Sequence, residues 1–265
     1  MIDYNEFVEA FYLQSGIDLK LYKEKQMKRR LTSLAEKHGF KSFMSFFHAM
    51  MEDRRLYDIF VNYMTINVSE FYRNPGQWKL LEDVIIPMLR SAKKDFADIK
   101  IWSSACSTGD EPYTLVMILN KFVPLDKIKI LASDIDLAAI EKAKQGVYHE
   151  RSIKDLPLEF KNKYFSKVNE NTYKISEDVI SCVEFRQINL LADDYPKEND
   201  LIICRNVLIY FTEEAKYMVY KKFNLVLAQD GILFLGNTEQ IISSAKFGLK
   251  PIRTFFYQKV RDVRE

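Results

Sequence analysis

The chain has 265 residues, of which 48% are hydrophobic and 29% are charged, and its formal net charge is +2. These values are typical of one large or two smaller globular domains, and the near-neutral charge excludes a polycationic chain or an acidic tail as the basis of partner binding. Three distant cysteines and three histidines predict free thiols in a reducing compartment and no metal site. No segment is apolar enough for a signal peptide or a membrane span, so we expect a cytoplasmic protein without membrane insertion.

Residues 1–75 are predicted to form a helical N-terminal domain, because apolar residues recur there at three- and four-residue steps. Helices are expected over 23–37, 42–51 and 55–64. The segment 64–75 then alternates polar and apolar residues and ends at a proline, which forbids simple helix continuation. It fits either a linker with Ser69 as a helix cap or part of a site, and these patterns do not choose between the two.

The helix predicted over 23–37 is strongly basic. Met27, Leu31 and Leu34 form a narrow apolar stripe, and most of the basic side chains fall on the opposite arc. Such an arc is usually a solvated face, but it also suits an acidic protein surface, and nucleic acid is the competing partner. The basic residues considered for partner binding are Lys23, Lys25, Lys28, Arg29 and Arg30.

From about residue 99, strands alternate with helices, which predicts a doubly wound, mostly parallel α/β sheet within a second domain, 76–265. Residues 147–182 break that alternation and predict a small inserted β-subdomain. The segment 248–260 is interpreted as one long final strand, paired antiparallel. The expected strands are 99–103, 128–133, 183–187, 200–204 and 231–236, and the expected helices are 111–122, 136–145 and 213–228.

The segment Ile99–Tyr113 has the layout of a nucleotide-binding strand, turn and helix, but Asp110 and Glu111 stand where the helix begins. Helix N-termini favour anions, and two carboxylates there would repel a dinucleotide pyrophosphate. A cationic ligand fits better. S-adenosylmethionine carries a sulfonium and an ammonium and no phosphate, so Glu111 is a candidate partner for its ammonium. The alternatives are purely structural roles, namely a turn at Gly109 and a helix cap at Asp110.

Two further strands end in polar residues. Asp134 follows the second strand and is placed to accept hydrogen bonds from ribose hydroxyls, whereas Asp136 fits the N-cap of the next helix better. The apolar strand 200–204 delivers Arg205, Asn206 and Tyr210 just past its carboxyl end. Ligands bind at that edge of open α/β sheets, so these side chains are predicted to line the same site.

Five motifs together resemble the chemotaxis-receptor glutamate methyltransferases, the CheR family, over nearly the whole chain. They are Asn67–Arg73 (NVSEFYR), Trp102–Tyr113 (WSSACSTGDEPY), Ala132–Asp136 (ASDID), Cys204–Tyr210 (CRNVLIY) and Leu235–Glu239 (LGNTE). Each motif alone is moderately specific, but their order and spacing are highly specific. The resemblance implies a Rossmann-like class I methyltransferase sheet with an all-helical N-terminal domain and an inserted β-subdomain.

The resemblance also implies residue roles. Arg73 and Tyr210 would face the reacting methyl group and the incoming glutamate, and the basic helix would meet the acidic helical bundle of a cytoplasmic chemoreceptor domain. We expect a monomer that binds no nucleic acid and converts S-adenosylmethionine to S-adenosylhomocysteine. The residues expected around the cofactor are Asn67, Ser69, Arg73, Glu111, Asp134, Asn189, Leu190, Arg205 and Asn206.

The sequence departs from the family pattern in three places. Ser69 stands where many members have threonine, and Asp110 stands where glutamate is common. Members that dock on a receptor pentapeptide carry a glycine-containing loop in the β-subdomain, whereas 167–173 is short and has no glycine. We therefore expect no need for the pentapeptide tether. The alternatives are a nucleic-acid base methyltransferase, which the absence of an Asn/Asp-Pro-Pro-aromatic run opposes, and a non-catalytic cofactor-binding module.

Overall fold

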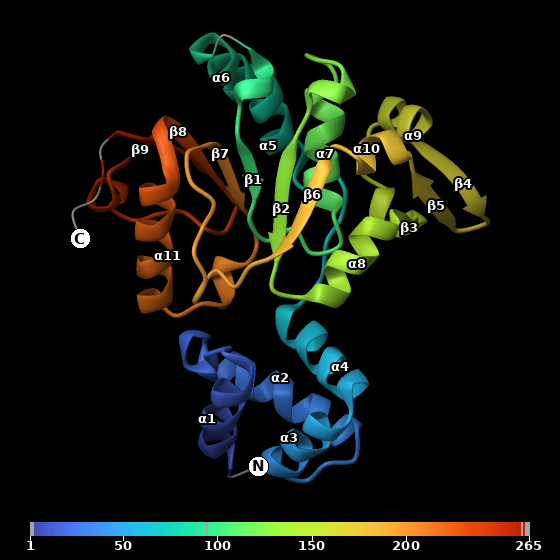
Figure 1. The fold of residues 1–265 in the computed structure, drawn as a ribbon, viewed down its shortest axis with the longest axis vertical. Helices are drawn as coiled ribbons and strands as arrows, with labels where there is room; N and C mark the ends of the chain where they lie inside the picture. Colours follow the sequence, from blue (N-terminus) through green and yellow to red (C-terminus); the bar gives the residue numbers. More distant parts are fainter. Residues whose placement is uncertain (1–2, 94, 261, 263–265) are drawn as a thin grey trace.

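The computed structural model describes residues 3–93, 95–260 and 262. Its N-terminal part is entirely helical, with fully buried aromatic rings of Phe7, Phe11, Phe46 and Phe60 at its centre. The three helices predicted over 23–64 are confirmed, with ends shifted by one residue. The four helices are α1 Tyr4–Ser15, α2 Glu24–Lys37, α3 Phe43–Glu52 and α4 Arg54–Thr65, and Figure 1 shows them below the rest of the molecule.

The C-terminal part is built on a seven-stranded sheet of order β6-β2-β1-β7-β8-β10-β9. The first five strands of that order run parallel, and β10 pairs antiparallel with both of its neighbours. All five predicted strands are present. The strands are β1 Ile101–Ser103, β2 Ile130–Asp134, β6 Val183–Gln187, β7 Asn199–Cys204, β8 Leu227–Leu235, β9 Leu249–Arg253 and β10 Phe256–Lys259.

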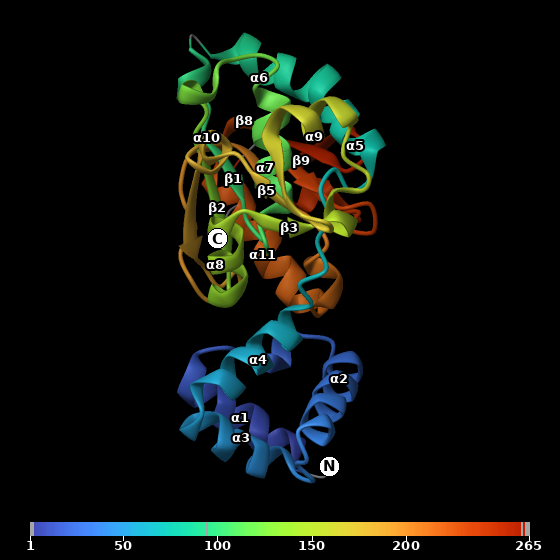
Figure 2. The ribbon, with the colours of Figure 1, turned by 90° about the vertical axis from the view of Figure 1, so that its right-hand side faces the viewer.

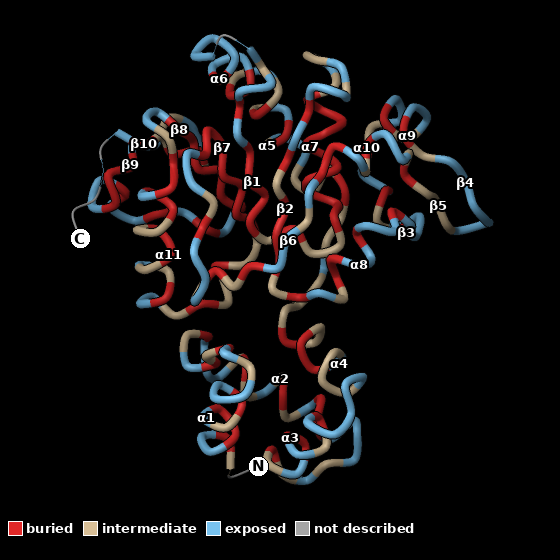
Figure 3. Tube along the Cα trace, viewed as in Figure 1, coloured by how far each residue is buried: buried red, intermediate tan, exposed pale blue. Residues whose placement is uncertain are grey.

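Alternate side chains of each central strand enter different apolar clusters, as the pleat of a strand requires. Trp102 and Ile202 pack with α11 on one face, and this cluster continues into the N-terminal helices, whereas Ile101 and Leu201 pack on the other face. Figure 3 colours the central strands β1 and β7 as buried, whereas the edge strands β6 and β9 are largely exposed. The helices of this part are α5 Pro75–Leu80, α6 Ile86–Ala92, α7 Asp110–Leu119, α8 Leu137–Gln145, α9 Leu158–Tyr164, α10 Glu177–Ile180 and α11 Glu213–Val226.

The predicted insertion forms a three-stranded antiparallel sheet of order β3-β5-β4, placed to one side of the main sheet in Figure 1. Helix α9 precedes its β4–β5 hairpin, and the turn between those strands consists of Glu170 and Asn171. The strands are β3 Val147–His149, β4 Phe165–Asn169 and β5 Thr172–Ile175.

The single final strand predicted over 248–260 is wrong. The segment folds back as a hairpin, in which β9 and β10 are separated by Thr254 and by Phe255 at φ 67°. The antiparallel pairing of its last part with β8 is confirmed. Helices α5 and α6 were not predicted, and between them lies a π-helical turn, Leu81–Ile85, just before Pro87. A proline clashes with the carbonyl four residues earlier, and a π-turn opens the helix at that point.

The two parts are joined by a linker, 66–74, that rises from α4 to α5 along one side of the molecule (Figure 2). Within the described ranges, no helix is long and apolar enough to cross a membrane.

Candidate active site

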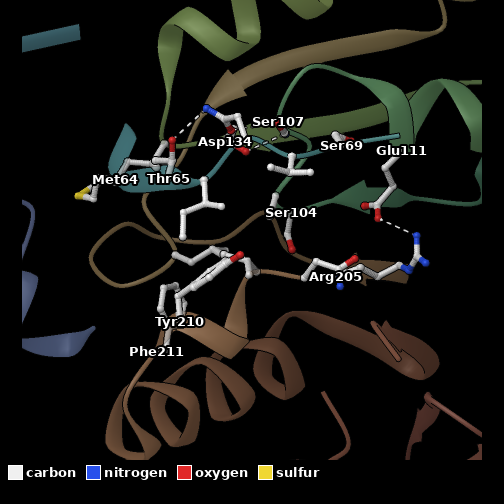
Figure 4. A pocket seen from close by; sticks show the side chains of 18 of the residues that line it. Met64, Thr65, Ser69, Ser104, Ser107, Glu111, Asp134, Arg205, Tyr210 and Phe211 are labelled. Atoms are coloured by element: carbon white, nitrogen blue, oxygen red, sulfur yellow. Dashed lines mark hydrogen bonds and ion pairs between the residues drawn. The ribbon is translucent and has the colours of Figure 1, made fainter. Parts of the chain in front are cut away.

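A pocket lies where the carboxyl ends of β1, β2 and β7 meet the linker and the N-terminal helices (Figure 4). It brings together all ten residues that the sequence placed near the cofactor or the reacting groups. Their contacts with a ligand stay a prediction, but their shared pocket is observed. These ten are Asn67, Ser69, Arg73, Glu111, Asp134, Asn189, Leu190, Arg205, Asn206 and Tyr210.

The turn after β1 is shaped by Gly109, which has φ 89° and precedes α7. A Cβ built there would lie 2.8 Å from the Tyr113 ring and 2.9 Å from the Ala143 side chain, so glycine is required both by conformation and by space. Asp110 does not cap the helix as one interpretation held. It is the first helical residue, and its carboxylate accepts a hydrogen bond from the Thr108 hydroxyl at 2.6 Å.

Asp134 holds the turn after β1 against the end of β2. Its two carboxylate oxygens accept the backbone N–H groups of Ser107 at 2.8 Å and Asp136 at 3.0 Å. Burial raises the pKa of Asp134 to about 6, although those hydrogen bonds oppose the rise. The carboxylate also faces the pocket, where it has lone pairs left for ligand hydroxyls.

Asp136 joins the two parts of the chain. One of its carboxylate oxygens caps α8 by accepting the N–H groups of Ala138 and Ala139, which confirms the predicted N-cap. The other oxygen accepts hydrogen bonds from Asn62, Thr65 and Asn67 at 3.0, 3.2 and 2.6 Å. The pattern of a cap residue gave no indication of this second role.

Glu111 and Arg205 form a buried pair at the other end of the pocket from Asp134 (Figure 4), with 3.5 Å between the Glu111 Oε2 and Arg205 Nη1 atoms. Glu111 also accepts a hydrogen bond from the Ser103 hydroxyl at 2.8 Å. Burial raises the pKa of Glu111 to about 7, against the lowering effect of the Arg205 charge. A cationic ligand group beside Glu111 would lower the pKa of this carboxyl and keep it ionised. The resulting ion pair would stabilise the bound ligand.

The Arg205 guanidinium is fixed from several sides. It lies 5.0 Å from the centres of the Trp78 and Phe234 rings, and it donates hydrogen bonds to the Arg73 carbonyl and the Gln77 side chain, each at 2.9 Å. Its buried Nε has no partner among the described residues. Arg205 also lines the pocket, where its guanidinium suits an anionic ligand group such as a carboxylate.

Glu239 is a structural support for the site whose role the sequence did not reveal. Its buried carboxylate accepts the backbone N–H groups of Asn206 at 2.7 Å and Leu208 at 2.8 Å. It thereby holds the loop that carries Tyr210, in which Asn206 has φ 61°. Gly236 leaves room for it, since a Cβ there would lie 2.5 Å from the Glu239 Oε2 atom. The only indication in the sequence that Glu239 belongs near the site was its position in the LGNTE motif.

Of the two alternatives for the linker, a helix cap at Ser69 is wrong. Ser69 lies in non-helical backbone and faces the pocket, and Asn74, not Ser69, precedes α5. Ile66, Tyr72 and Asn74 all have φ between 51° and 62°, a region that costs a β-branched residue such as Ile66 energy. The Arg73 guanidinium donates to the Val68 carbonyl at 3.0 Å and so closes this loop beside the pocket.

The basic residues of α2 divide into two groups. Lys25, Lys28 and Arg29 line a shallow surface groove with Thr32, Ser33 and Glu36. Arg30 is instead half-buried against α4, where it donates to the Tyr63 carbonyl at 2.6 Å and lies over the Tyr63 ring at 4.6 Å. Arg30 therefore supports the last turn of α4, and its contact with a receptor stays a prediction. Lys23 precedes the helix, and its backbone N–H donates to the Tyr210 carbonyl at 2.9 Å.

The strand order, and the carboxylates at both ends of a pocket at the carboxyl edge of the sheet, fit the class of S-adenosylmethionine-dependent methyltransferases. Residues 67–256 match the family model of the CheR methyltransferase SAM-binding domain, and residues 2–65 match the model of the CheR all-alpha domain. The chain belongs to the CheR family.

Curated relatives agree with this assignment. The chain is 40% identical over 257 residues to the chemotaxis protein methyltransferase of Listeria innocua, which covers 97% of both chains. It is 32% identical to the chemotaxis protein methyltransferase of Borreliella burgdorferi, over 89% of this chain and 87% of the relative. The Escherichia coli chemotaxis protein methyltransferase is 30% identical, over 87% of this chain and 82% of the relative.

The affinity for S-adenosylhomocysteine is expected to depend on pH through Glu111. Its pKa of about 7 in the free protein must fall when a cationic amino group binds beside it, so affinity should rise with pH up to about 7 and then level off. Titration calorimetry between pH 5 and about 8.5 would measure this. Glu111→Gln should bind more weakly and show only the smaller pH dependence due to Asp110 and Asp134, whose pKa values are about 6. An unchanged pH profile in Glu111→Gln would contradict the expectation.

Proposed function

We propose that this protein methylates glutamate side chains of chemoreceptors, forming methyl esters. The observation that carries the proposal is a single pocket whose wall contains the carboxylates Glu111 and Asp134. The same wall contains Arg73 and Tyr210. The bound cofactor supplies a methyl group activated by a positively charged sulfur. The receptor carboxylate would accept this methyl group and become an ester, and S-adenosylhomocysteine would be left. Membership of the CheR family and the names of its chemotaxis relatives support the same substrate.

The proposed nucleophile needs no general base. A glutamate with an ordinary pKa of about 4.3 is ionised at neutral pH, and no histidine is among the described residues that line the pocket. The work of the protein is then to orient and hold the carboxylate. We assign that role to the Arg73 guanidinium, through a charge-assisted hydrogen bond, and we place Tyr210 beside the reacting methyl group. Glu111 and Arg205 would hold the amino and carboxyl groups of the cofactor, and Asp134 its ribose.

The test is to incubate the protein with cofactor labelled in the methyl group and with chemoreceptor-containing membranes. Base-labile label on receptor protein is the expected result. Label in added RNA would instead favour a nucleic-acid base methyltransferase, and cofactor binding without transfer to either acceptor would favour a non-catalytic module. Either of these results would overturn the proposal.

We infer that the groove on α2 meets the acidic helical bundle of the receptor. Lys25 and Arg29 are exposed one turn apart, so they present charge to one side of the helix. Arg29→Glu should lower kcat/KM for receptor methylation about five- to tenfold at low salt, with a smaller loss at high salt. The affinity for S-adenosylhomocysteine should not change.

The matched control for that prediction is Lys142→Glu, which makes the same charge change at an exposed position of α8. It should leave receptor methylation within about twofold of the original rate. Equal losses in the two variants would mean that net charge, and not the α2 surface, controls the encounter.

The protein is proposed to act without a pentapeptide tether. The β4–β5 hairpin, where tethered family members have a glycine-containing loop, here turns through Glu170 and Asn171 alone. Titration of the protein with a C-terminal receptor pentapeptide should therefore show no binding in the micromolar range. Binding of S-adenosylhomocysteine by the same sample would verify that it is folded, and a micromolar pentapeptide affinity would refute the prediction.

A further inference from the structure

Tyr22 comes from the N-terminal part of the chain, yet it lines the cofactor pocket. It lies in the short segment between α1 and α2, and it forms an isolated antiparallel bridge with Phe211. The bridge is flanked by two backbone hydrogen bonds. Lys23 donates to the Tyr210 carbonyl, and Thr212 donates to the Leu21 carbonyl, each at 2.9 Å. This pairing fixes Tyr22 next to the loop that carries Tyr210.

The Tyr22 side chain is also fixed. Its ring packs edge-on against Phe211, with the centroids 5.2 Å apart and the planes at 89°, and the residue is only 7% exposed. Among the described residues, its hydroxyl has no hydrogen-bond partner. Because Tyr22 belongs to the pocket wall, this unpaired hydroxyl is free to form a hydrogen bond with a ligand, which is worth about 1 kcal/mol.

The surroundings of Tyr22 indicate which end of the ligand it meets. It lines the pocket together with Met64, Ile188 and Leu190, and the Asp134 carboxylate is close enough to help burial raise the Tyr22 pKa. The hydroxyl therefore stays protonated at neutral pH and can donate. Figure 4 places Asp134 away from Glu111 and Arg205, so Tyr22 is associated with the nucleoside end of the pocket, not with its amino-acid end.

We propose that Tyr22 is a cofactor-binding residue supplied by the N-terminal domain, whose hydroxyl donates a hydrogen bond to the adenosine portion of the ligand. The proposal rests on S-adenosylmethionine as cofactor and not on glutamate as the methyl acceptor. The N-terminal helices would then complete the cofactor site as well as present a docking surface.

The test uses the full chain and titration calorimetry with two ligands, S-adenosylhomocysteine and 5′-methylthioadenosine, which lacks the amino-acid portion. Tyr22→Phe should weaken both by about three- to tenfold, the effect of one lost hydrogen bond. The matched control is Tyr4→Phe, because Tyr4 is a 3% exposed tyrosine of the same domain whose hydroxyl also has no partner among the described residues. It should leave both affinities unchanged.

A second variant locates the effect. Glu111→Gln should weaken S-adenosylhomocysteine but not 5′-methylthioadenosine, whereas Tyr22→Phe should weaken both. Melting temperatures measured without ligand should be the same for Tyr22→Phe and the original chain. Unchanged affinities in Tyr22→Phe, or equal losses in Tyr4→Phe, would overturn the inference. Failure of receptor methylation with the Tyr22→Phe result intact would overturn only the proposed substrate.

Discussion

Replacing Arg73 by alanine is expected to lower kcat for receptor methylation about 10- to 100-fold, the usual effect of losing one charge-assisted hydrogen bond to the reacting group. The Arg73 backbone is anchored by its carbonyl, which accepts from Arg205. The guanidinium donates to the neighbouring Val68 carbonyl and lines the pocket. The affinity for S-adenosylhomocysteine should stay within about threefold, because Glu111, Asp134 and Arg205 remain.

Arg73→Lys is the matched variant, since it keeps the charge but removes the planar fork that fits a carboxylate. It should retain more activity than Arg73→Ala and less than the original chain. Single-turnover rates with saturating cofactor would separate transfer from binding. If Arg73→Ala turned over at the original rate, Arg73 would have no part in the reaction.

Asp136→Ala should lower the free energy of unfolding by about 3 kcal/mol, since it removes a helix cap and leaves three partly buried donors without their acceptor. One carboxylate oxygen serves α8, and the other accepts from Asn62, Thr65 and Asn67. Urea denaturation would measure the loss. Because Asn67 lines the pocket, the affinity for S-adenosylhomocysteine should fall as well.

Thr212→Ala is the control for that experiment. The Thr212 hydroxyl caps α11 by accepting the Ala215 N–H, so its loss should cost only about 1 kcal/mol. Equal destabilisation by the two variants would show that the three side-chain donors around Asp136 add nothing to stability.

The sequence predicted the main sheet well because its strands are short apolar runs bounded by polar residues, a pattern that burial on both faces imposes. It failed at the final hairpin because the turn contains Thr254 and Phe255, neither of which is a typical turn residue. It also missed α5 and α6, whose π-turn accommodates Pro87 within an otherwise helical stretch.

The pocket residues were predictable for a related reason. Residues at the carboxyl ends of parallel strands lie along one edge of the sheet, which places Asp134 and Arg205 in the wall of one pocket from sequence alone. Tyr22 and Glu239 follow no such rule. Tyr22 reaches the site through tertiary packing of another domain, and Glu239 acts on backbone N–H groups of a loop more than thirty residues away in the chain. Sequence patterns describe neighbours along the chain and strand ends, not these contacts.

The hydrogen bond from the Lys23 backbone to the Tyr210 carbonyl has a consequence for receptor modification. Helix α2 begins at the next residue, Glu24, so the proposed receptor surface and the proposed cofactor site lie at opposite ends of one short connection. Any factor by which the cofactor strengthens receptor binding must then equal the factor by which the receptor strengthens cofactor binding. If that factor exceeds one, a cell with little methyl donor would hold its receptors less tightly as well as modify them more slowly.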